Sequence, residues 1–286
     1  MNLLPELLNI LDLEKIDENV FRGKNLDIGS MAVYGGQVLA QSVMAASRTV
    51  DPKRTIHSLH SYFLRWGNNE KDIIYKVSIA RDGGSFSARR VSAYQDDKLI
   101  FILAASFHIK EETPYSHQKS AINVASADSL NSFADNFAHF AEKFEIKPKG
   151  LYSAESPLIF HPIEKFDPFN PGRRAPVSHV WFKTNGAIPT DPVINNAIAA
   201  YASDFSLLIT ALFPHDISLF TTPLRIASID HAMWFHRPIK ADEWLLYAVE
   251  SPNMSNATGF CTGSIFDIDG NLVASVAQEG LLRVMK

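Results

Sequence analysis

The order of predicted secondary structure repeats along the chain, and this duplication constrains the fold more than any other feature. A helical stretch at 37–48 precedes four strand-like segments, and a second one at 193–212 precedes four more. The strand-like segments are rich in β-branched and aromatic residues; they cover 56–65, 73–81, 85–95, 98–110, 224–237, 243–250, 256–267 and 271–283. A helix followed by an antiparallel meander predicts an α+β fold in which each sheet wraps one long helix.

The duplication is also visible in the residues themselves. Residues 60–65, 73–77 and 99–105 can be aligned with 231–236, 245–249 and 272–278. The offset of about 170 residues is too long for a solenoid repeat and fits a duplicated domain. Pairing of the edge strands of two such halves would build one continuous sheet and remove an exposed edge.

We therefore predict a first domain over residues 1–112 and a second over 151–286. The segment 113–150 between them has polar, proline-bearing ends and is interpreted as a linker that docks a helix. Apolar residues recur in its middle at helical spacing, at Leu130, Phe133, Ala134, Phe137, Ala141 and Phe144. A short amphipathic helix is also expected at 3–13, before the first repeat.

The composition excludes several classes of protein. With 46% hydrophobic and 20% charged residues, the 286-residue chain resembles packed globular proteins and not disordered ones. A formal charge of −4 gives no broad positive field, so no nucleic-acid partner is expected. The longest apolar run, 99–105, is far shorter than the ~20 residues of a membrane helix, so no membrane span is expected.

Cysteine usage and the chain ends bear on location. Cys261 is the single cysteine, which excludes an internal disulfide and a cysteine cage for zinc and fits a reducing compartment. The first residues lack the basic region of a secretion signal, and the last three are not the peroxisomal Ser-Lys-Leu. The cytoplasm is the expected location.

The sequence has no local catalytic motif: the nucleophile elbow, the phosphate loop, the dinucleotide fingerprint and the zinc-binding His-Glu-x-x-His helix are all absent. A catalytic site must therefore combine residues that are distant in sequence. Asp204 lies on the apolar stripe of the second helix, and Gln278 is the one polar residue on its face of the last strand. A buried carboxylate and a buried carboxamide each need hydrogen-bond partners or a ligand.

These patterns also allow plainer interpretations. If the helical stripe is shifted by one residue, Asp204 lies at the solvent-exposed edge of the helix face. Ser228 is equally typical of an ordinary serine in a strand. Together, however, a carboxylate, a hydroxyl and a carboxamide could activate a water molecule for hydrolysis. Cys261 has no activating neighbour in the sequence and is interpreted as a small buried side chain.

Three further residues, His57, Arg65 and Arg89, are candidates for substrate binding. Arginines such as Arg65 and Arg89 bind phosphates, although at strand ends they are usually solvated. His57 and His60 are three apart on a predicted strand and so lie on opposite faces, which argues against a shared metal site. No metal and no cofactor is expected.

Segments along nearly the whole chain resemble the acyl-CoA thioesterase II family. They are Val20–Gly23, Tyr34–Val38, His57–Arg65, Asp82–Arg90, Tyr201–Asp204, Ile229–Pro238, Glu243–Tyr247 and Gln278–Gly280. The resemblance implies a double hotdog fold, in which two tandem hotdog repeats each wrap a long helix, and an acyl-CoA substrate hydrolysed to fatty acid and CoA. Relatives associate, so a homodimer or homotetramer is expected.

The resemblance also implies the catalytic residues. Family members activate water with an aspartate, a threonine or serine, and a glutamine, which match Asp204, Ser228 and Gln278. Many bacterial relatives have threonine at the position of Ser228; the hydroxyl is kept, so the mechanism should survive. A hotdog acyl-CoA hydratase is the alternative enzyme, but its Asp-x-Asn-Pro-x-His signature has no match, since the nearest string, 167–172, has the wrong spacing and no histidine. A non-catalytic acyl-CoA binding protein is the third interpretation.

Overall fold

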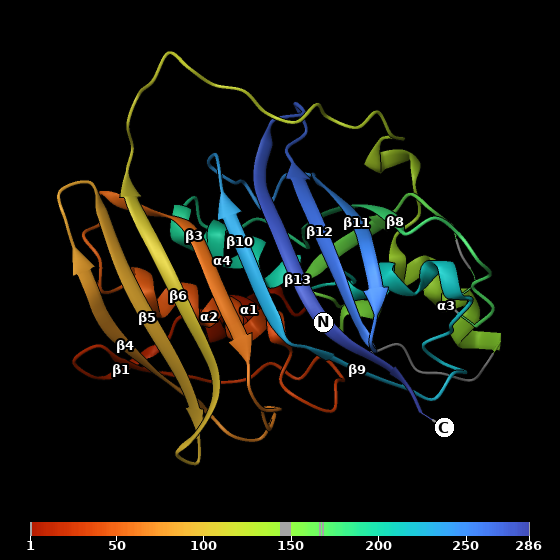
Figure 1. The fold of residues 1–286 in the computed structure, drawn as a ribbon, viewed down its shortest axis with the longest axis horizontal. Coiled ribbons are helices and arrows are strands. Elements are labelled where there is room, and N and C mark those ends of the chain that lie inside the picture. Colours follow the sequence, from red (N-terminus) through yellow and green to blue (C-terminus); the bar gives the residue numbers. More distant parts are fainter. Residues whose placement is uncertain (1, 144–149, 166, 168, 286) are drawn as a thin grey trace.

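The computed structural model describes residues 2–143, 150–165, 167 and 169–285, and a 13-stranded antiparallel sheet dominates it (Figure 1). The strand order is β1-β2-β4-β5-β6-β3-β10-β13-β12-β11-β8-β7, and β9 pairs with the end of β13. The strands are β1 (Glu14–Asp17), β2 (Val20–Gly23), β3 (Arg54–Phe63), β4 (Ile73–Asp82), β5 (Phe86–Gln95), β6 (Lys98–Ile109), β7 (Leu158–Pro162), β8 (Val177–Thr184), β9 (Leu224–Ser228), β10 (Asp230–Phe235), β11 (Leu245–Ser255), β12 (Thr258–Phe266) and β13 (Leu272–Val284).

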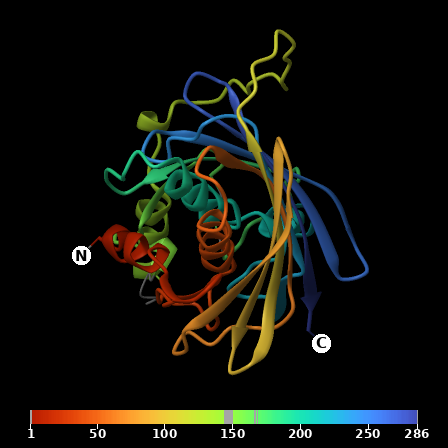
Figure 2. The ribbon, with the colours of Figure 1, turned by 90° about the vertical axis from the view of Figure 1, so that its left-hand side faces the viewer.

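The two long helices, α2 and α4, lie beside each other on one side of this sheet (Figure 2). Both are buried nearly all round, as expected for helices in a core. The α-helices are α1 (Leu4–Leu11), α2 (Gly35–Ser47), α3 (Phe133–Lys143) and α4 (Pro192–Ser203), and the 3-10 helices are η1 (Ala127–Ser129), η2 (Gly150–Tyr152) and η3 (Leu208–His215).

The two halves share the sheet through one strand pair. β3 and β10 run antiparallel, with Leu59 opposite Met233 and Ser61 opposite His231. The consecutive strands β4, β5 and β6 form a meander on one side of this pair, and β11, β12 and β13 form the other. The prediction that edge strands extend one sheet is therefore confirmed.

The second helical stretch ends earlier than its apolar stripe suggests. Instead of continuing to residue 212, α4 stops at Ser203, and Asp204 is its C-cap. Ser206 has a positive φ of 61°, which an α-helix does not tolerate, and the chain resumes as the 3-10 helix η3. The apolar pattern continues through the break because η3 also buries apolar residues, among them Leu208, Leu212 and Phe213.

The strand expected at 224–237 is divided in two. Ile229 separates β9 from β10; its N–H donates to Glu279 O, and its C=O accepts from the N–H of Phe63, both at 2.9 Å. Ser228 lies opposite Gly280 and Ala232 opposite Ala277, so both pieces pair with β13. One change of hydrogen-bond partner in a continuous β-rich run leaves no signal in the sequence.

Residues 110–126 cross from β6 to the second half of the sheet before η1 and α3 begin (Figure 1). The predicted docked helix corresponds to α3, and Phe144, expected at its end, lies outside the described residues. Strand β7 lies outside the strand-like segments predicted from the sequence.

In the described part of the chain, one helical stretch, Pro192–His215, is long and apolar enough to cross a membrane. The most apolar part of this stretch is 78% buried inside the protein. Such burial is typical of a core helix.

The first half contains a buried polar cluster around Gln41 of α2. Gln41 Nε2 donates to the carbonyl oxygens of Ile10 and Lys24 at 2.8 Å, and its Oε1 accepts from Tyr75 Oη at 2.6 Å. Both side chains are fully buried. The cluster ties the chain before α2 to the first half of the sheet, and the nitrogen and oxygen of the buried Gln41 carboxamide both have partners.

Candidate active site

The fold brings Asp204, Ser228 and Gln278 together from three elements. Asp204 caps α4, Ser228 ends β9, and Gln278 lies in the middle of β13. Gln278 Nε2 donates to Asp204 Oδ1 at 3.2 Å and to Ser228 Oγ at 2.9 Å. The Ser228 hydroxyl also donates to the Asp204 carboxylate. The hydrolytic trio predicted from the sequence is thus one connected hydrogen-bond network.

Sheet register explains the proximity of Ser228 and Gln278. Ser228 lies opposite Gly280, two positions after Gln278 on β13. Side chains two positions apart share a face, so Ser228 and Gln278 are diagonal neighbours on the same side of the sheet. Gln278 is almost fully buried there.

Asp204 also contacts the N-terminus of α2, which the first half supplies. The backbone N–H of Gly36 donates to its carboxylate. A Cβ at Gly35 would lie 2.7 Å from Asp204 Oδ2, and one at Gly36 would lie 2.3 Å from the Tyr201 carbonyl oxygen. Tyr34 Oη, just before α2, donates to that same carbonyl at 3.0 Å. Only glycines let the two helix ends approach this closely.

Burial sets the protonation of the site. Desolvation raises the pKa of Asp204, although the nearby His231, the hydrogen bonds from Gln278 and Ser228, and the Gly36 N–H act in the opposite direction. Burial lowers the pKa of His231, which the Asp204 charge partly offsets. A carboxylate with a raised pKa and several fixed donors is suited to accept a proton from water.

His231 and Ser203 belong to this network, and the sequence analysis does not identify either of them as functional. His231 Nδ1 lies 2.5 Å from Gln278 Oε1, and its Nε2 lies 2.9 Å from Ser203 Oγ. Both side chains are fully buried. Ser203 directly precedes Asp204, and His231 aligns with His60 of the first half. These two positions are the features of the sequence that could have marked the residues as candidates.

A pocket of about 690 Å³ opens beside the trio. Ser228 and Gly35 lie in its wall, next to the Asp204 carboxylate. Much of the remaining lining is apolar and comes from both halves of the chain: Val33, Val38, Phe63, Phe101, Ile226 and Leu281. An elongated apolar group could therefore reach the trio.

Of the three residues predicted to bind substrate, Arg65 lies at this pocket. Its exposed guanidinium donates through Nη1 to Leu99 O at 2.6 Å, and Trp66 beside it is 58% exposed. The guanidinium of Arg225 lies 5.9 Å from the Trp66 ring. His57 is not in the pocket lining; its Nε2 lies 2.8 Å from Ser106 Oγ.

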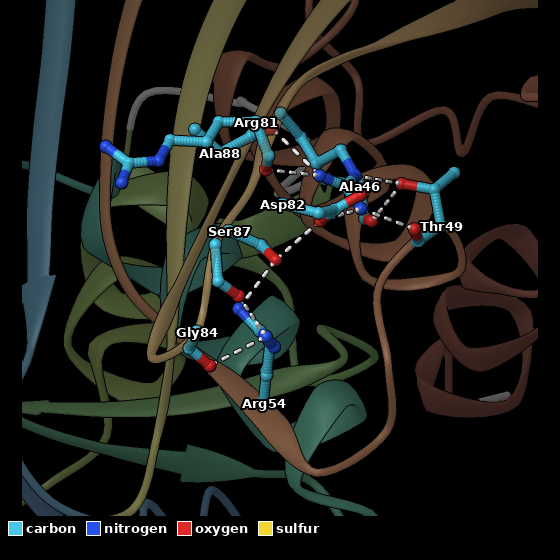
Figure 3. A network of polar contacts seen from close by, with 10 residues as sticks. Ala46, Thr49, Arg54, Arg81, Asp82, Gly84, Ser87 and Ala88 are labelled. Carbon is cyan, nitrogen blue, oxygen red and sulfur yellow. Dashed lines mark hydrogen bonds and ion pairs between the residues drawn. The ribbon is translucent and has the colours of Figure 1, made fainter.

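Arg89 lies in a network of intramolecular hydrogen bonds and not in the pocket lining. Its side chain is 3% exposed and donates to Thr49 Oγ1 at 2.9 Å, Thr49 O at 2.8 Å and Asp82 Oδ1 at 2.8 Å. Figure 3 shows Thr49, Asp82 and Ser87 in this network, which links the end of α2 to the β4–β5 turn. Because these bonds occupy the guanidinium, we do not assign Arg89 to substrate.

Within residues 2–143, 150–165, 167 and 169–285, no three histidine, cysteine, aspartate or glutamate side chains are grouped so that they could hold a metal ion.

The free Cys261 is buried opposite Gln278, and burial raises the pKa of its thiol to about 11. It is therefore a poor nucleophile at neutral pH.

Solved structures identify the class of fold. The chain matches a protein from Alicyclobacillus acidocaldarius described as having a hot dog fold, with a TM-score of 0.78, 16% identity and coverage of 98% of this chain and 99% of that one. It matches the acyl-CoA thioesterase II TesB2 from Mycobacterium marinum with a TM-score of 0.79, 35% identity and 98% coverage of both chains. The large antiparallel sheet and its buried helices are thus those of hotdog-fold thioesterases.

Sequence comparison identifies the family. The chain is 38% identical over 285 residues to acyl-CoA thioesterase 2 of Haemophilus influenzae, covering 99% of this chain and 98% of the relative. Family models match residues 24–108, as an acyl-CoA thioesterase N-terminal domain, and 159–281, as an acyl-CoA thioesterase. The protein belongs to the acyl-CoA thioesterase II family, as the resemblance in its sequence predicts.

Replacing the Arg89 guanidinium tests its structural role. We expect Arg89→Met to lower the free energy of unfolding by about 2–4 kcal/mol, because the hydrogen bonds of a buried, charged donor to Thr49 and Asp82 are lost, and to leave the KM for acyl-CoA unchanged. Chemical denaturation and steady-state kinetics measure the two effects. Arg90→Met, at the exposed neighbouring position, is the matched control. A raised KM at unchanged stability would instead return Arg89 to the substrate site.

Proposed function

We propose that the protein hydrolyses fatty acyl-CoA thioesters with Asp204 as the general base. The observation that carries this proposal is the network of Asp204, Ser228 and Gln278 beside an apolar pocket. Asp204 Oδ1 is bound by Gln278, while Oδ2 lies next to Gly35 in the pocket wall. Oδ2 is therefore the oxygen placed to take a proton from a water molecule in the pocket.

The reaction follows from this arrangement. Water attacks the thioester carbonyl carbon as its proton moves to Asp204, and a tetrahedral oxyanion forms. The C–S bond then breaks, and the thiolate of CoA leaves and is protonated, which releases a fatty acid and CoA. The positive end of α2 lies beside the pocket and favours the oxyanion. Ser228 and Gln278 hold the carboxylate, and the free lone pair of the Ser228 hydroxyl can accept a hydrogen bond from the water.

We further propose that Arg65 binds the phosphates of CoA and that the apolar pocket receives the acyl chain. Arg65 and Trp66 line the pocket, and CoA has phosphates and an adenine ring that such groups bind. The apolar lining from both halves supports an acyl chain within the pocket.

We also infer a tandem double hotdog, with repeats at 1–112 and 151–286 joined by the linker 113–150. The separate family matches at 24–108 and 159–281 support this division, as does the pairing of the two meanders through β3 and β10. Assembly into homodimers or homotetramers and location in the cytoplasm stay predictions of the sequence.

Substitution of the proposed base is the direct test of the hydrolytic function. We expect Asp204→Asn to fold normally and to reduce kcat by roughly 100-fold or more, because an amide cannot accept the proton. Release of CoA thiol from a medium-chain acyl-CoA, followed with a chromogenic reagent, measures turnover. Full turnover by the folded variant would contradict the assignment. In the wild type, loss of enoyl absorbance would instead indicate a hydratase, and saturable binding without thiol release would indicate a carrier.

The pH dependence of kcat tests the environment of Asp204. Only the ionised carboxylate accepts a proton, and burial raises its pKa. Activity should therefore fall as pH decreases, with an acid midpoint above the ordinary aspartate value of about 4. Thiol release measured across pH at saturating substrate gives this midpoint. A midpoint at or below the ordinary value would contradict a desolvated base.

Removal of the Arg65 guanidinium tests CoA recognition. We expect Arg65→Ala to raise the KM for acyl-CoA about 5- to 10-fold, because a charged hydrogen bond to phosphate is lost. Hydrolysis of the same acyl group on N-acetylcysteamine, which lacks phosphates, should be unaffected. Arg90→Ala serves as an exposed arginine outside the pocket lining. Equal effects on both thioesters would exclude a phosphate contact.

A further inference from the structure

Both ends of the Gln278 carboxamide are hydrogen-bonded. Its Nε2 gives one hydrogen to Asp204 Oδ1 and the other to Ser228 Oγ. Its Oε1 lies 2.5 Å from His231 Nδ1. A carboxamide oxygen only accepts, so His231 Nδ1 must carry a hydrogen and donate it.

The Nδ1 hydrogen decides which way the amide of Gln278 points. In the rotated amide, the NH₂ group would face the imidazole N–H, and Oε1 would face the carboxylate of Asp204. Donor would then oppose donor, and acceptor would oppose acceptor. In a buried site, each such mismatch is strongly unfavourable.

The second imidazole nitrogen contacts Ser203. His231 Nε2 lies 2.9 Å from Ser203 Oγ, whose single hydrogen is donated to the carbonyl oxygen of Ala200 at 2.9 Å. Ser203 therefore packs against the imidazole, and the contact with Gln278 Oε1 is the one that requires a hydrogen on Nδ1. Burial lowers the pKa of His231 and so favours the neutral imidazole, which carries one hydrogen.

The backbone of His231 is also fixed, at the strand pair that joins the two halves. His231 lies opposite Ser61 of β3, and Ser61 Oγ donates to the His231 carbonyl oxygen at 2.8 Å. Both side chains are buried. The imidazole therefore has a defined position relative to β13 and Gln278.

We propose that His231 is a positioning residue for hydrolysis: its Nδ1–H fixes the Gln278 carboxamide so that both amide hydrogens face Asp204 and Ser228. The role rests on the proposed function, because His231 acts only through those three side chains. His231 takes no proton from water and does not contact the substrate.

Two substitutions at one position separate this role from simple packing. His231→Asn keeps an N–H donor near the place of Nδ1, whereas His231→Leu removes it. We expect His231→Leu to reduce kcat by about 10- to 100-fold with little change in KM, and His231→Asn to recover most of the loss. Tyr75→Phe, which removes another buried side-chain hydrogen bond in the first half, is the matched control and should keep wild-type kcat. Equal losses in His231→Asn and His231→Leu would overturn the proposal.

A double-mutant cycle shows whether His231 acts through Gln278. In a Gln278→Ala background the amide is gone, so His231→Leu should have no further effect on kcat. Additive losses would overturn the positioning role while leaving the hydrolytic assignment intact. Wild-type turnover by Gln278→Ala itself would instead contradict the proposed function.

A measurement on the wild-type protein covers the case in which His231→Leu does not fold. The ¹⁵N resonances of the His231 imidazole, assigned by their absence from His231→Asn, should show a hydrogen on Nδ1 and an unprotonated Nε2 at neutral pH. A neutral imidazole with its hydrogen on Nε2 could not donate to Gln278 and would refute the inference.

Discussion

The site depends on one close approach, between the N-terminus of α2 and the Asp204 carboxylate at the end of α4. Gly35 and Gly36 make it possible, since a Cβ at either would overlap Asp204 or the carbonyl of Tyr201. The approach gives the carboxylate a backbone N–H and the positive end of a helix. Separation of the two helices by even one methyl group would remove both of these interactions from the carboxylate.

This approach makes the site a joint product of the two halves. The Asp204, Ser228 and Gln278 side chains all come from the second half, but the first half supplies the Gly36 N–H and much of the pocket wall. The β3–β10 pair holds the halves in one sheet and thereby fixes α2 relative to α4. The two halves thus form one composite site.

Within the site, burial and hydrogen bonding act on Asp204 in opposite directions. Desolvation favours the neutral carboxyl, while Gln278, Ser228 and Gly36 favour the charged one. Hydrogen-bond donors alone would lower the pKa of Asp204 and make it a weak base. Desolvation alone would leave Asp204 as a neutral acid. Their combination holds a carboxylate in place with a raised affinity for protons, which suits proton abstraction from water.

The sequence by itself determined the combination of helices with an antiparallel sheet and the residues whose polarity conflicts with an apolar face. Asp204 and Gln278 stood out because helix and strand periods report which residues point inward. Tertiary structure decided which polar residues meet. Arg65 lies at the pocket and Arg89 in a structural network, although both are arginines near strand ends. His231 and Ser203 join the site through strand pairing and a helix end that no local pattern records, because hydrogen bonds across β3, β10 and β13 depend on residues far apart in the chain.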